Sequence, residues 1–156
     1  MGGHQHGGIV AAGIQGDMLM KRSANAVWSG NLKTGHGRFN VASGAIKNQK
    51  YDFRTRFEEE PGTNPEELIA AAHASCFSMA FSAQLGERGI TPEAIETACV
   101  VTFENLTLTR SALTTTVTAR GADRAKIDEA AAAAKAGCPI SKVLKLEIAL
   151  DLTIND

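Results

Sequence analysis

The stretch that decides the fold is GTNPEELIAAAHASCFSM, residues 62–79. It opens with explicit helix-start signals: Asn64 can cap the helix, Pro65 suits its first position, and Glu67 falls three residues after the cap. No charged side chain occurs from 68 to 86, a run of nineteen positions. The stretch therefore predicts one long helix that begins at Pro65 and is poor in charge.

This helix is predicted to run to about Leu85 and to end at Gly86 or Gly89. Apolar residues surround it rather than lining one stripe, which is typical of a helix buried on nearly all sides. Although the uncharged run is long enough for a membrane span, His73 and several serines interrupt it, so we expect a buried helix of a globular protein. Because one small domain has difficulty burying so long a helix, we expect a second subunit to cover part of it.

Size and composition predict a single globular domain. Residues 1–18 are rich in glycine and histidine and are interpreted as an expression-tag leader, which leaves one domain over 19–156. Sixteen Lys and Arg balance seventeen Asp and Glu, so nothing favours binding to nucleic acid or to an anionic membrane. Three cysteines, none in a CxxC pair, argue against a disulfide framework or a zinc ribbon and favour a reducing, cytoplasmic compartment.

The remaining pattern predicts an α+β fold with mostly antiparallel sheets packed on the long helix. Alternation of aromatic and charged residues over Tyr51–Glu58 predicts a strand, with Arg56 on its charged face. Turns are expected at Glu104-Asn105 and at Arg110-Ser111. Further strands are expected over 24–28, 38–41, 98–104, 113–120 and 147–154, and further helices over 122–136 and 139–144.

The three thiols differ in their surroundings. Cys99 lies inside an expected strand and is interpreted as a small core residue. Cys76 lies mid-helix among apolar residues, where burial raises the pKa of a thiol and keeps it inert unless a cation is brought to it. Cys138 stands between Gly137 and Pro139, at the N-cap of the following helix, where the helix dipole favours a thiolate.

Two such thiols in a reduced chain predict a linked reaction, in which one becomes a sulfenic acid and the other condenses with it to a disulfide. Arg56 is our candidate for the cation that activates Cys76, with Arg38 as the second choice. A guanidinium at about 4 Å contributes about 4 kcal/mol at an effective dielectric of 20, enough to offset a burial shift of about 2–3 pKa units. Glu66 could orient this arginine through a bidentate ion pair.

Helix geometry then predicts a homodimer. Glu66 and Cys76 are ten residues apart, so one straight helix separates them by about 15 Å. Two copies of the helix that cross antiparallel about a two-fold axis near Ala71 would bring Glu66 of one chain beside Cys76 of the other. We therefore expect the site to be assembled between two subunits.

His73 lies three residues before Cys76 and faces roughly the same side of the helix. A hydrolytic Cys-His dyad and half of a metal site are the alternatives it raises. Two ligands do not complete a metal site, so a buried histidine with a structural role is the favoured interpretation.

Residues 62–79 resemble the signature helix of the osmotically inducible protein C (OsmC) family. Residues 134–141, AKAGCPIS, are similar to the second cysteine motif of that family, and residues 51–58 resemble it as well. The likeness extends over about 24–152. His73 and the Arg-Phe-Glu triplet at 56–58 make the chain more similar to the OsmC branch than to the sister branch of organic hydroperoxide resistance (Ohr) proteins.

The resemblance implies a thiol-dependent peroxidase that acts in stress defence on organic hydroperoxides and more weakly on hydrogen peroxide. By carry-over, Cys76 is the peroxidatic thiol and Cys138 the resolving one, Arg56 stabilises the thiolate, and Glu66 holds the arginine. The sister branch draws its arginine from an earlier loop, so Arg38 stays open. The resemblance further implies an intertwined homodimer with sites at the interface, a lipoyl or similar dithiol as reductant, and no metal, flavin or haem.

Two other classes of function remain as alternatives. A non-catalytic redox sensor would use the same thiols but would be oxidised once without turnover, and no basic element for reading DNA supports it. A small-ligand binding protein with inert cysteines would form no disulfide after treatment with cumene hydroperoxide.

Overall fold

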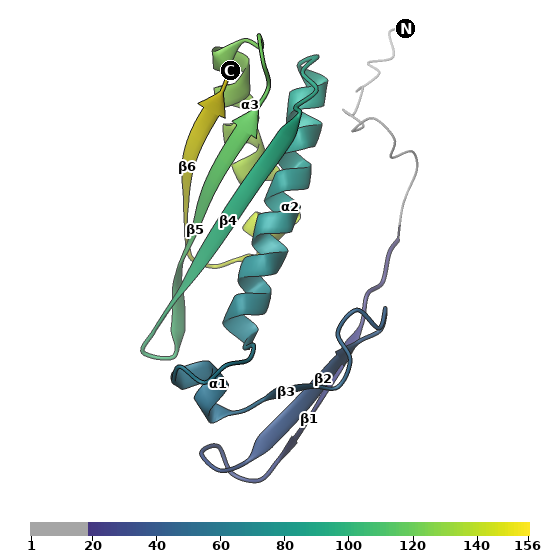
Figure 1. The fold of residues 1–156 in the computed structure, drawn as a ribbon, viewed down its shortest axis with the longest axis vertical. Coiled ribbons are helices and arrows are strands. Elements are labelled where there is room, and N and C mark those ends of the chain that lie inside the picture. The colour runs from purple at the N-terminus through teal and green to yellow at the C-terminus, as the bar shows by residue number, and fades with distance from the viewer. Residues whose placement is uncertain (1–18) are drawn as a thin grey trace, which may run out of the picture.

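The computed structural model of the protein describes residues 19–156, so the predicted leader over 1–18 lies outside the described residues. A long helix joins two separate three-stranded sheets, with strand orders β1-β2-β3 and β4-β5-β6 (Figure 1). In chain order the elements are β1 Ala24–Ser29, β2 His36–Val41, β3 Gln49–Tyr51, α1 Phe53–Phe57, α2 Pro65–Glu87, β4 Ala94–Glu104, β5 Thr107–Thr118, α3 Arg124–Gly137, α4 Pro139–Val143 and β6 Glu147–Asn155.

Helix α2 begins and ends as its sequence predicts. The Asn64 side chain caps it by accepting a hydrogen bond from the Glu67 backbone N–H at 2.8 Å, and Pro65 occupies the first turn. The last helical residue is Glu87, and Gly89 follows with a φ of +73°, a left-handed conformation that glycine adopts without strain.

The single chain buries only one face of α2, whereas the sequence predicts burial on nearly all sides. The buried residues recur every fourth position, at His73, Phe77, Phe81 and Leu85. This face packs against β4, α3 and α4. By length and composition alone α2 could cross a membrane, but a core helix of a globular protein passes the same test. The opposite face of α2 is left open by this chain.

The second sheet and the helices that follow it form the main body. β4 and β5 form an antiparallel hairpin, and its turn at Asn105 and Leu106 adopts positive φ values of 47° and 60°. The second expected turn is wrong, because Arg110 and Ser111 lie inside β5 and pair with both neighbouring strands. β6 pairs with β5 in parallel, an exception to the mostly antiparallel expectation that the crossover through α3 and α4 makes necessary.

The strand predicted over Tyr51–Glu58 is wrong beyond its first residue. β3 ends at Tyr51, and Asp52 starts the short helix α1 through a capping box, in which its side chain accepts from the Thr55 backbone N–H and Thr55 Oγ1 accepts from the Asp52 N–H, both at 3.0 Å. A sequence pattern with a period of two also repeats every four residues, and residues four apart lie on one face of a helix. Phe53 and Phe57 accordingly stack with ring centroids 4.7 Å apart.

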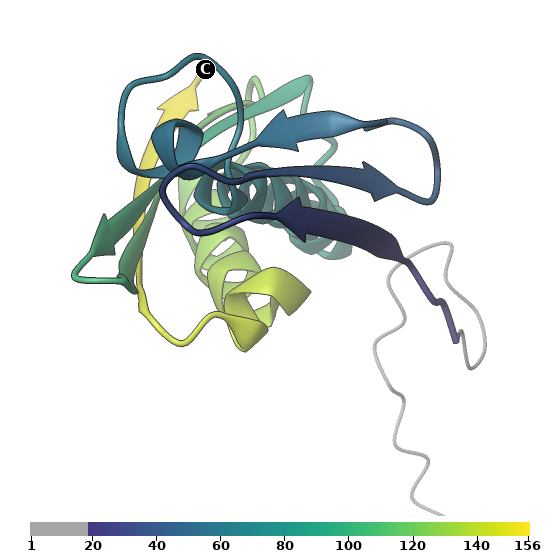
Figure 2. The ribbon, with the colours of Figure 1, turned by 90° about the horizontal axis from the view of Figure 1, so that it is seen from below.

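The first sheet lies across one end of α2 (Figure 2), and Figure 1 shows it apart from the β4-β5-β6 sheet. Every residue of β1 is exposed, and the exposed fractions of Val27 and Leu32 are 66% and 61%. The aromatic residues of this sheet contact one another across its strands. The Tyr51 ring centroid lies 5.6 Å from that of Trp28 and 5.7 Å from that of Phe39. Three strands that expose this much apolar surface lack a core of their own.

Candidate active site

The fold brings two of the three thiols together. Cys76 lies on α2 and Cys138 at the junction of α3 and α4, 62 residues later, and their sulfurs are 2.9 Å apart. Both are free cysteines. Cys138 is completely buried and Cys76 is partly exposed, so Cys76 is the sulfur of this pair that a dissolved molecule can reach.

Neighbouring groups move the two thiol pKa values in opposite directions. Burial raises the pKa of Cys76, and the hydrogen bond with Cys138 raises it further. Burial also opposes ionisation of Cys138, but hydrogen bonds with Cys76, Ser141 and the Ile140 backbone outweigh it and lower the pKa of Cys138. Within one chain the surroundings therefore disfavour the Cys76 thiolate, and a nearby cation would oppose this effect.

Arg56 and Glu66 form a second pair at the start of α2. Arg56 donates from Nη2 to Glu66 Oε1 at 2.8 Å and from Nε to the same carboxylate at 3.2 and 3.4 Å. The guanidinium carbon also lies 5.3 Å from the ring centroids of Phe57 and Phe103. A forked ion pair between two aromatic rings holds the guanidinium in one orientation.

Arg38, the second choice for the cation, lies elsewhere. Its Nη1 donates to the Asn48 backbone oxygen at 2.9 Å within the first sheet. The structure thus brings Arg56, and not Arg38, together with Glu66.

The four predicted site residues fall into two pairs that one chain does not unite. The thiol pair lies ten residues along α2 from Glu66, which corresponds to about 15 Å of helix. A hollow of about 350 Å³ beside Arg56 and Glu66 includes Cys99 in its lining but not Cys76. Among residues 19–156, no hydrogen bond links Arg56 or Glu66 to Cys76 or Cys138.

His73 is a buried histidine without any bond to Cys76. Its Nδ1 lies 2.6 Å from Ser111 Oγ and its Nε2 lies 2.8 Å from Ser141 Oγ. Burial lowers the pKa of His73, so the ring is neutral. The hydrolytic Cys-His dyad is therefore wrong. Within residues 19–156, no group of three or more His, Cys, Asp or Glu side chains is arranged to hold a metal ion.

Sequence reasoning missed both serines that bind His73. Ser111 was assigned to a turn, and its contact with α2 depends on how β5 packs. Ser141 lies in α4, three residues after Cys138, and its contact with His73 depends on how α4 packs against α2.

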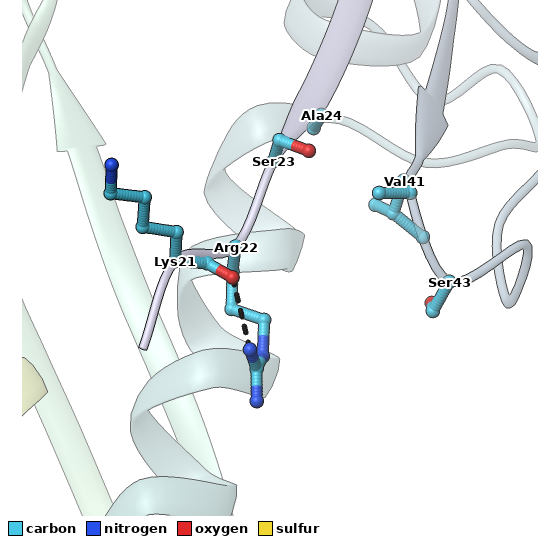
Figure 3. Close-up of a pocket in the computed structure, with 7 residues that line it drawn as sticks. Lys21, Arg22, Ser23, Ala24, Val41 and Ser43 are labelled. Carbon is cyan, nitrogen blue, oxygen red and sulfur yellow. Dashed lines mark hydrogen bonds between the residues drawn. The ribbon is translucent and has the colours of Figure 1, made fainter. Parts of the chain in front are cut away.

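Two hollows differ in their relation to this chemistry. One of about 290 Å³ contains Arg56 and is otherwise lined by Trp28, Leu32, Tyr51, Asp52, Phe53 and Phe57. Another of about 640 Å³ lies at the edge of the first sheet around Lys21, Arg22 and Val41, with an Arg22 side chain that donates to the Lys21 backbone oxygen at 2.9 Å (Figure 3). Neither a thiol nor Arg56 lines the second hollow, so only the first is placed to serve the site.

A thiol on a long core helix, beside a second thiol at a helix junction, defines a class of two-thiol α+β proteins. Within this class the chain belongs to the OsmC family, because residues 57–153 match the family described as OsmC-like protein. It is 47% identical over 142 residues to Peroxiredoxin OsmC of Escherichia coli (strain K12), which covers 88% of this chain and 99% of that protein. The predicted family is confirmed.

Solved structures agree with the fold. The Organic Hydroperoxide Resistance Protein OhrB of Bacillus subtilis is 25% identical with a TM-score of 0.57, and the match covers 85% of this chain and 98% of OhrB. An OsmC-like protein from Mycoplasma pneumoniae matches 89% of this chain and 100% of its own with a TM-score of 0.68, although only 15% of residues are identical. The predicted α+β OsmC-like fold is confirmed.

Proposed function

We propose that this protein is a thiol peroxidase that reduces organic hydroperoxides, and more weakly hydrogen peroxide, through Cys76 and Cys138. The observation that carries the proposal is the contact of 2.9 Å between a partly exposed and a buried sulfur. The names of the relatives support the same activity, since they include Peroxiredoxin OsmC and an organic hydroperoxide resistance protein.

The reaction would proceed in three steps. The Cys76 thiolate attacks one peroxide oxygen, the O–O bond breaks, an alcohol or water leaves, and Cys76 becomes a sulfenic acid. Cys138 then attacks the Cys76 sulfur, so that an S–S bond forms and water leaves. A dithiol reductant, lipoyl or similar, reduces the disulfide by thiol exchange and returns both cysteines to the thiol state.

Activation of Cys76 would require Arg56 from a second copy of the chain. Two α2 helices crossing antiparallel near Ala71 place Glu66 of each copy beside Cys76 of the other. The exposed face of α2 supports this arrangement, because it carries the small residues Ala71 and Ser75 and the apolar Met79. The uncovered first sheet supports it too, since a partner would bury the apolar surface that this chain leaves open.

The aromatic hollow beside Arg56 would receive the alkyl group of the substrate. Its rings, including Trp28 and Phe53, offer apolar contact, and Arg56 at its edge offers hydrogen bonds to the peroxide oxygens. This hydrophobic pocket is formed by residues of the first sheet, the turn after β1, and α1. The free cysteines fit a reducing compartment such as the cytoplasm.

Steady-state consumption of cumene hydroperoxide with a lipoyl dithiol tests the proposal. Wild-type protein should turn over many times, Cys76→Ser should consume no peroxide above buffer, and Cys138→Ser should react once and then accumulate overoxidised Cys76. Turnover that persists in Cys76→Ser would eliminate the assignment.

A further inference from the structure

The side chain of Asn64 bonds to two helices at once. Its Oδ1 accepts from the Glu67 backbone N–H at 2.8 Å and so caps α2, while its Nδ2 donates to the Thr55 backbone oxygen of α1 at 3.0 Å. These partners settle the orientation of the amide, because a backbone N–H only donates and a backbone carbonyl only accepts. Arg56 directly follows Thr55, and Glu66 directly precedes Glu67. Asn64 therefore links the residues next to both members of the Arg56–Glu66 pair.

Helix α1 needs such a link. It has five residues, Phe53–Phe57, and a helix this short is not stable without tertiary contacts. The end of a helix also leaves carbonyl groups without a helical N–H. The group that the Thr55 carbonyl would require is the Glu59 N–H, which lies beyond the end of α1. Thr55 is 6% exposed, so water has little access to take its place. The Asn64 amide supplies this hydrogen bond instead.

The loop between the two helices approaches Thr55 closely. Gly62 has a φ of +150°, and a Cβ added to it would lie 2.9 Å from Thr55 Cγ2, so a larger residue would push the loop and α1 apart. Arg54 also ties α1 to this loop through an ion pair with Glu60, but the Arg54 side chain is 60% exposed and such pairs contribute little to stability. We therefore expect the bond between Asn64 and buried Thr55 to contribute more.

We propose that Asn64 is a positioning residue for peroxide reduction: by binding α1 it holds Arg56 in place beside Glu66. The inference rests on the proposed function, because Arg56 is the cation that this function requires at Cys76. Asn64 acts through the arginine and not on the peroxide. If α1 shifts, the guanidinium loses its forked geometry, and its attraction for a thiolate falls with distance. A larger fraction of Cys76 then stays protonated at neutral pH.

Two variants separate this role from helix capping. Serine caps helices about as well as asparagine, so Asn64→Ser keeps the start of α2. Its shorter side chain has no amide to donate to the Thr55 carbonyl. Thr63→Ala is the matched control, because it removes a neighbouring hydroxyl that donates to Glu67 Oε1 at 3.3 Å, within the first turn of α2. Circular dichroism and thermal unfolding verify that both variants keep the fold.

NMR spectroscopy of Arg56 reports the position of its side chain directly. The Nε–H donates to the Glu66 carboxylate, so the ion pair slows exchange of this hydrogen with water, and the signal is assigned by its loss in Arg56→Met. Asn64→Ser should speed the exchange about fivefold, which corresponds to the loss of one ordinary hydrogen bond. Thr63→Ala should exchange at the wild-type rate. An unchanged rate in Asn64→Ser would overturn the proposal.

A titration connects the position of the arginine to the thiol. In a Cys99→Ser, Cys138→Ser background the only thiol is Cys76, and thiolate absorbance follows its ionisation without any peroxide. Adding Asn64→Ser should raise the Cys76 pKa by about half a unit to one unit, and adding Arg56→Met should raise it by about two units. The control substitution should leave it unchanged.

Failure of this inference and failure of the proposed function give different results. If Arg56→Met raises the Cys76 pKa and Asn64→Ser does not, the positioning role of Asn64 is overturned and the proposed function stands. If Arg56→Met leaves the pKa unchanged, the proposed activation of Cys76 is overturned, while faster Nε–H exchange in Asn64→Ser would still support the positioning of Arg56.

Discussion

The two sheets of this protein differ in how far their side chains are buried. In the β4-β5-β6 sheet, Leu113, Thr115 and Val117 alternate with outward residues and are almost completely buried against the helices. In the β1-β2-β3 sheet, all of β1 is exposed, and neighbouring apolar side chains such as Leu32 are also open to solvent. The first sheet and its first turn thus expose the large apolar side chains Val27, Trp28 and Leu32. The helices of this chain therefore cover the β4-β5-β6 sheet but leave much of the β1-β2-β3 sheet open, and the proposed dimer would supply the missing cover.

The site divides along the same line. The thiol pair belongs to the main body and is complete in one chain, with Cys138 held by α4 and by the packing of α3. The Arg56–Glu66 pair belongs to the end of α2 next to the first sheet, and it is fully formed although neither Cys76 nor Cys138 lines the hollow beside it. The proposed dimer would give this ion pair a function, because it would bring Arg56 to Cys76 of the other chain.

The largest effect on peroxide turnover is expected when the Cys76–Cys138 pair is broken in one chain and the Arg56–Glu66 pair in another. Cys76→Ser and Arg56→Met should each be nearly inactive, the first because the nucleophile is lost and the second because the partly buried Cys76 thiol stays protonated. After exchange of subunits between the two variants, about one quarter of wild-type turnover should return, since half of the dimers are mixed and each regains one of two sites. Peroxide consumption before and after mixing measures this.

No recovery in that mixture, with mixed dimers verified by native mass spectrometry, would mean that Arg56 and Cys76 act within one chain. A mixture of Cys76→Ser with Cys138→Ser is the control. Cys76 and Cys138 meet within one chain, so each chain of this mixed dimer lacks one of the two thiols. Sustained turnover should therefore not return.

The self-sufficiency of the main body is tested by Phe81→Ala. Phe81 is completely buried on α2, so its truncation should lower the free energy of unfolding by about 3–5 kcal/mol. Val27→Ala in the first sheet should change the stability of a dissociated chain by less than about 0.5 kcal/mol, because Val27 is mostly exposed there. Urea unfolding at low and high protein concentration compares them, and equal losses at low concentration would contradict the division.

The pH dependence of Cys76 oxidation tests whether Arg56 lowers the pKa of Cys76. A nearby guanidinium favours the thiolate and lowers the pKa of Cys76, while burial alone raises it. Arg56→Met should therefore move the midpoint of the pH–rate profile upward by about two units, with a loss of about 10²-fold at pH 7 that is recovered in alkaline solution. Stopped-flow oxidation across pH measures the midpoint, and an unchanged midpoint would exclude Arg56 as the activating cation.

The smallest effect is expected at the open face of α2. Met79 is 76% exposed in one chain, so Met79→Glu should hardly affect the folding of that chain. A carboxylate buried at a dimer interface is unfavourable, so the dissociation constant of the dimer should rise at least about tenfold. Sedimentation equilibrium gives the constant, with circular dichroism to verify the fold. A dissociation constant equal to that of wild type would place the interface elsewhere.

Local chemistry explains which elements the sequence predicted well. The start of α2 depends on Asn64, Pro65 and Glu67, which act on neighbouring backbone groups and can be read without any tertiary contact. The segment over 51–58 was misassigned because its alternation fits a strand and, over Phe53–Phe57, also fits a short helix. Asp52 decided between them through its hydrogen bonds with Thr55.

The sequence by itself determined the extent of α2, the placement of one thiol inside it and of another at a helix junction, and the family to which the chain belongs. Only the tertiary structure decided that the sulfurs of Cys76 and Cys138 meet across 62 residues, that Arg56 is the arginine held by Glu66, and that His73 bonds to Ser111 and Ser141. Caps and charge patterns act over a few residues, whereas contacts between distant segments depend on how whole elements pack, which no short pattern encodes.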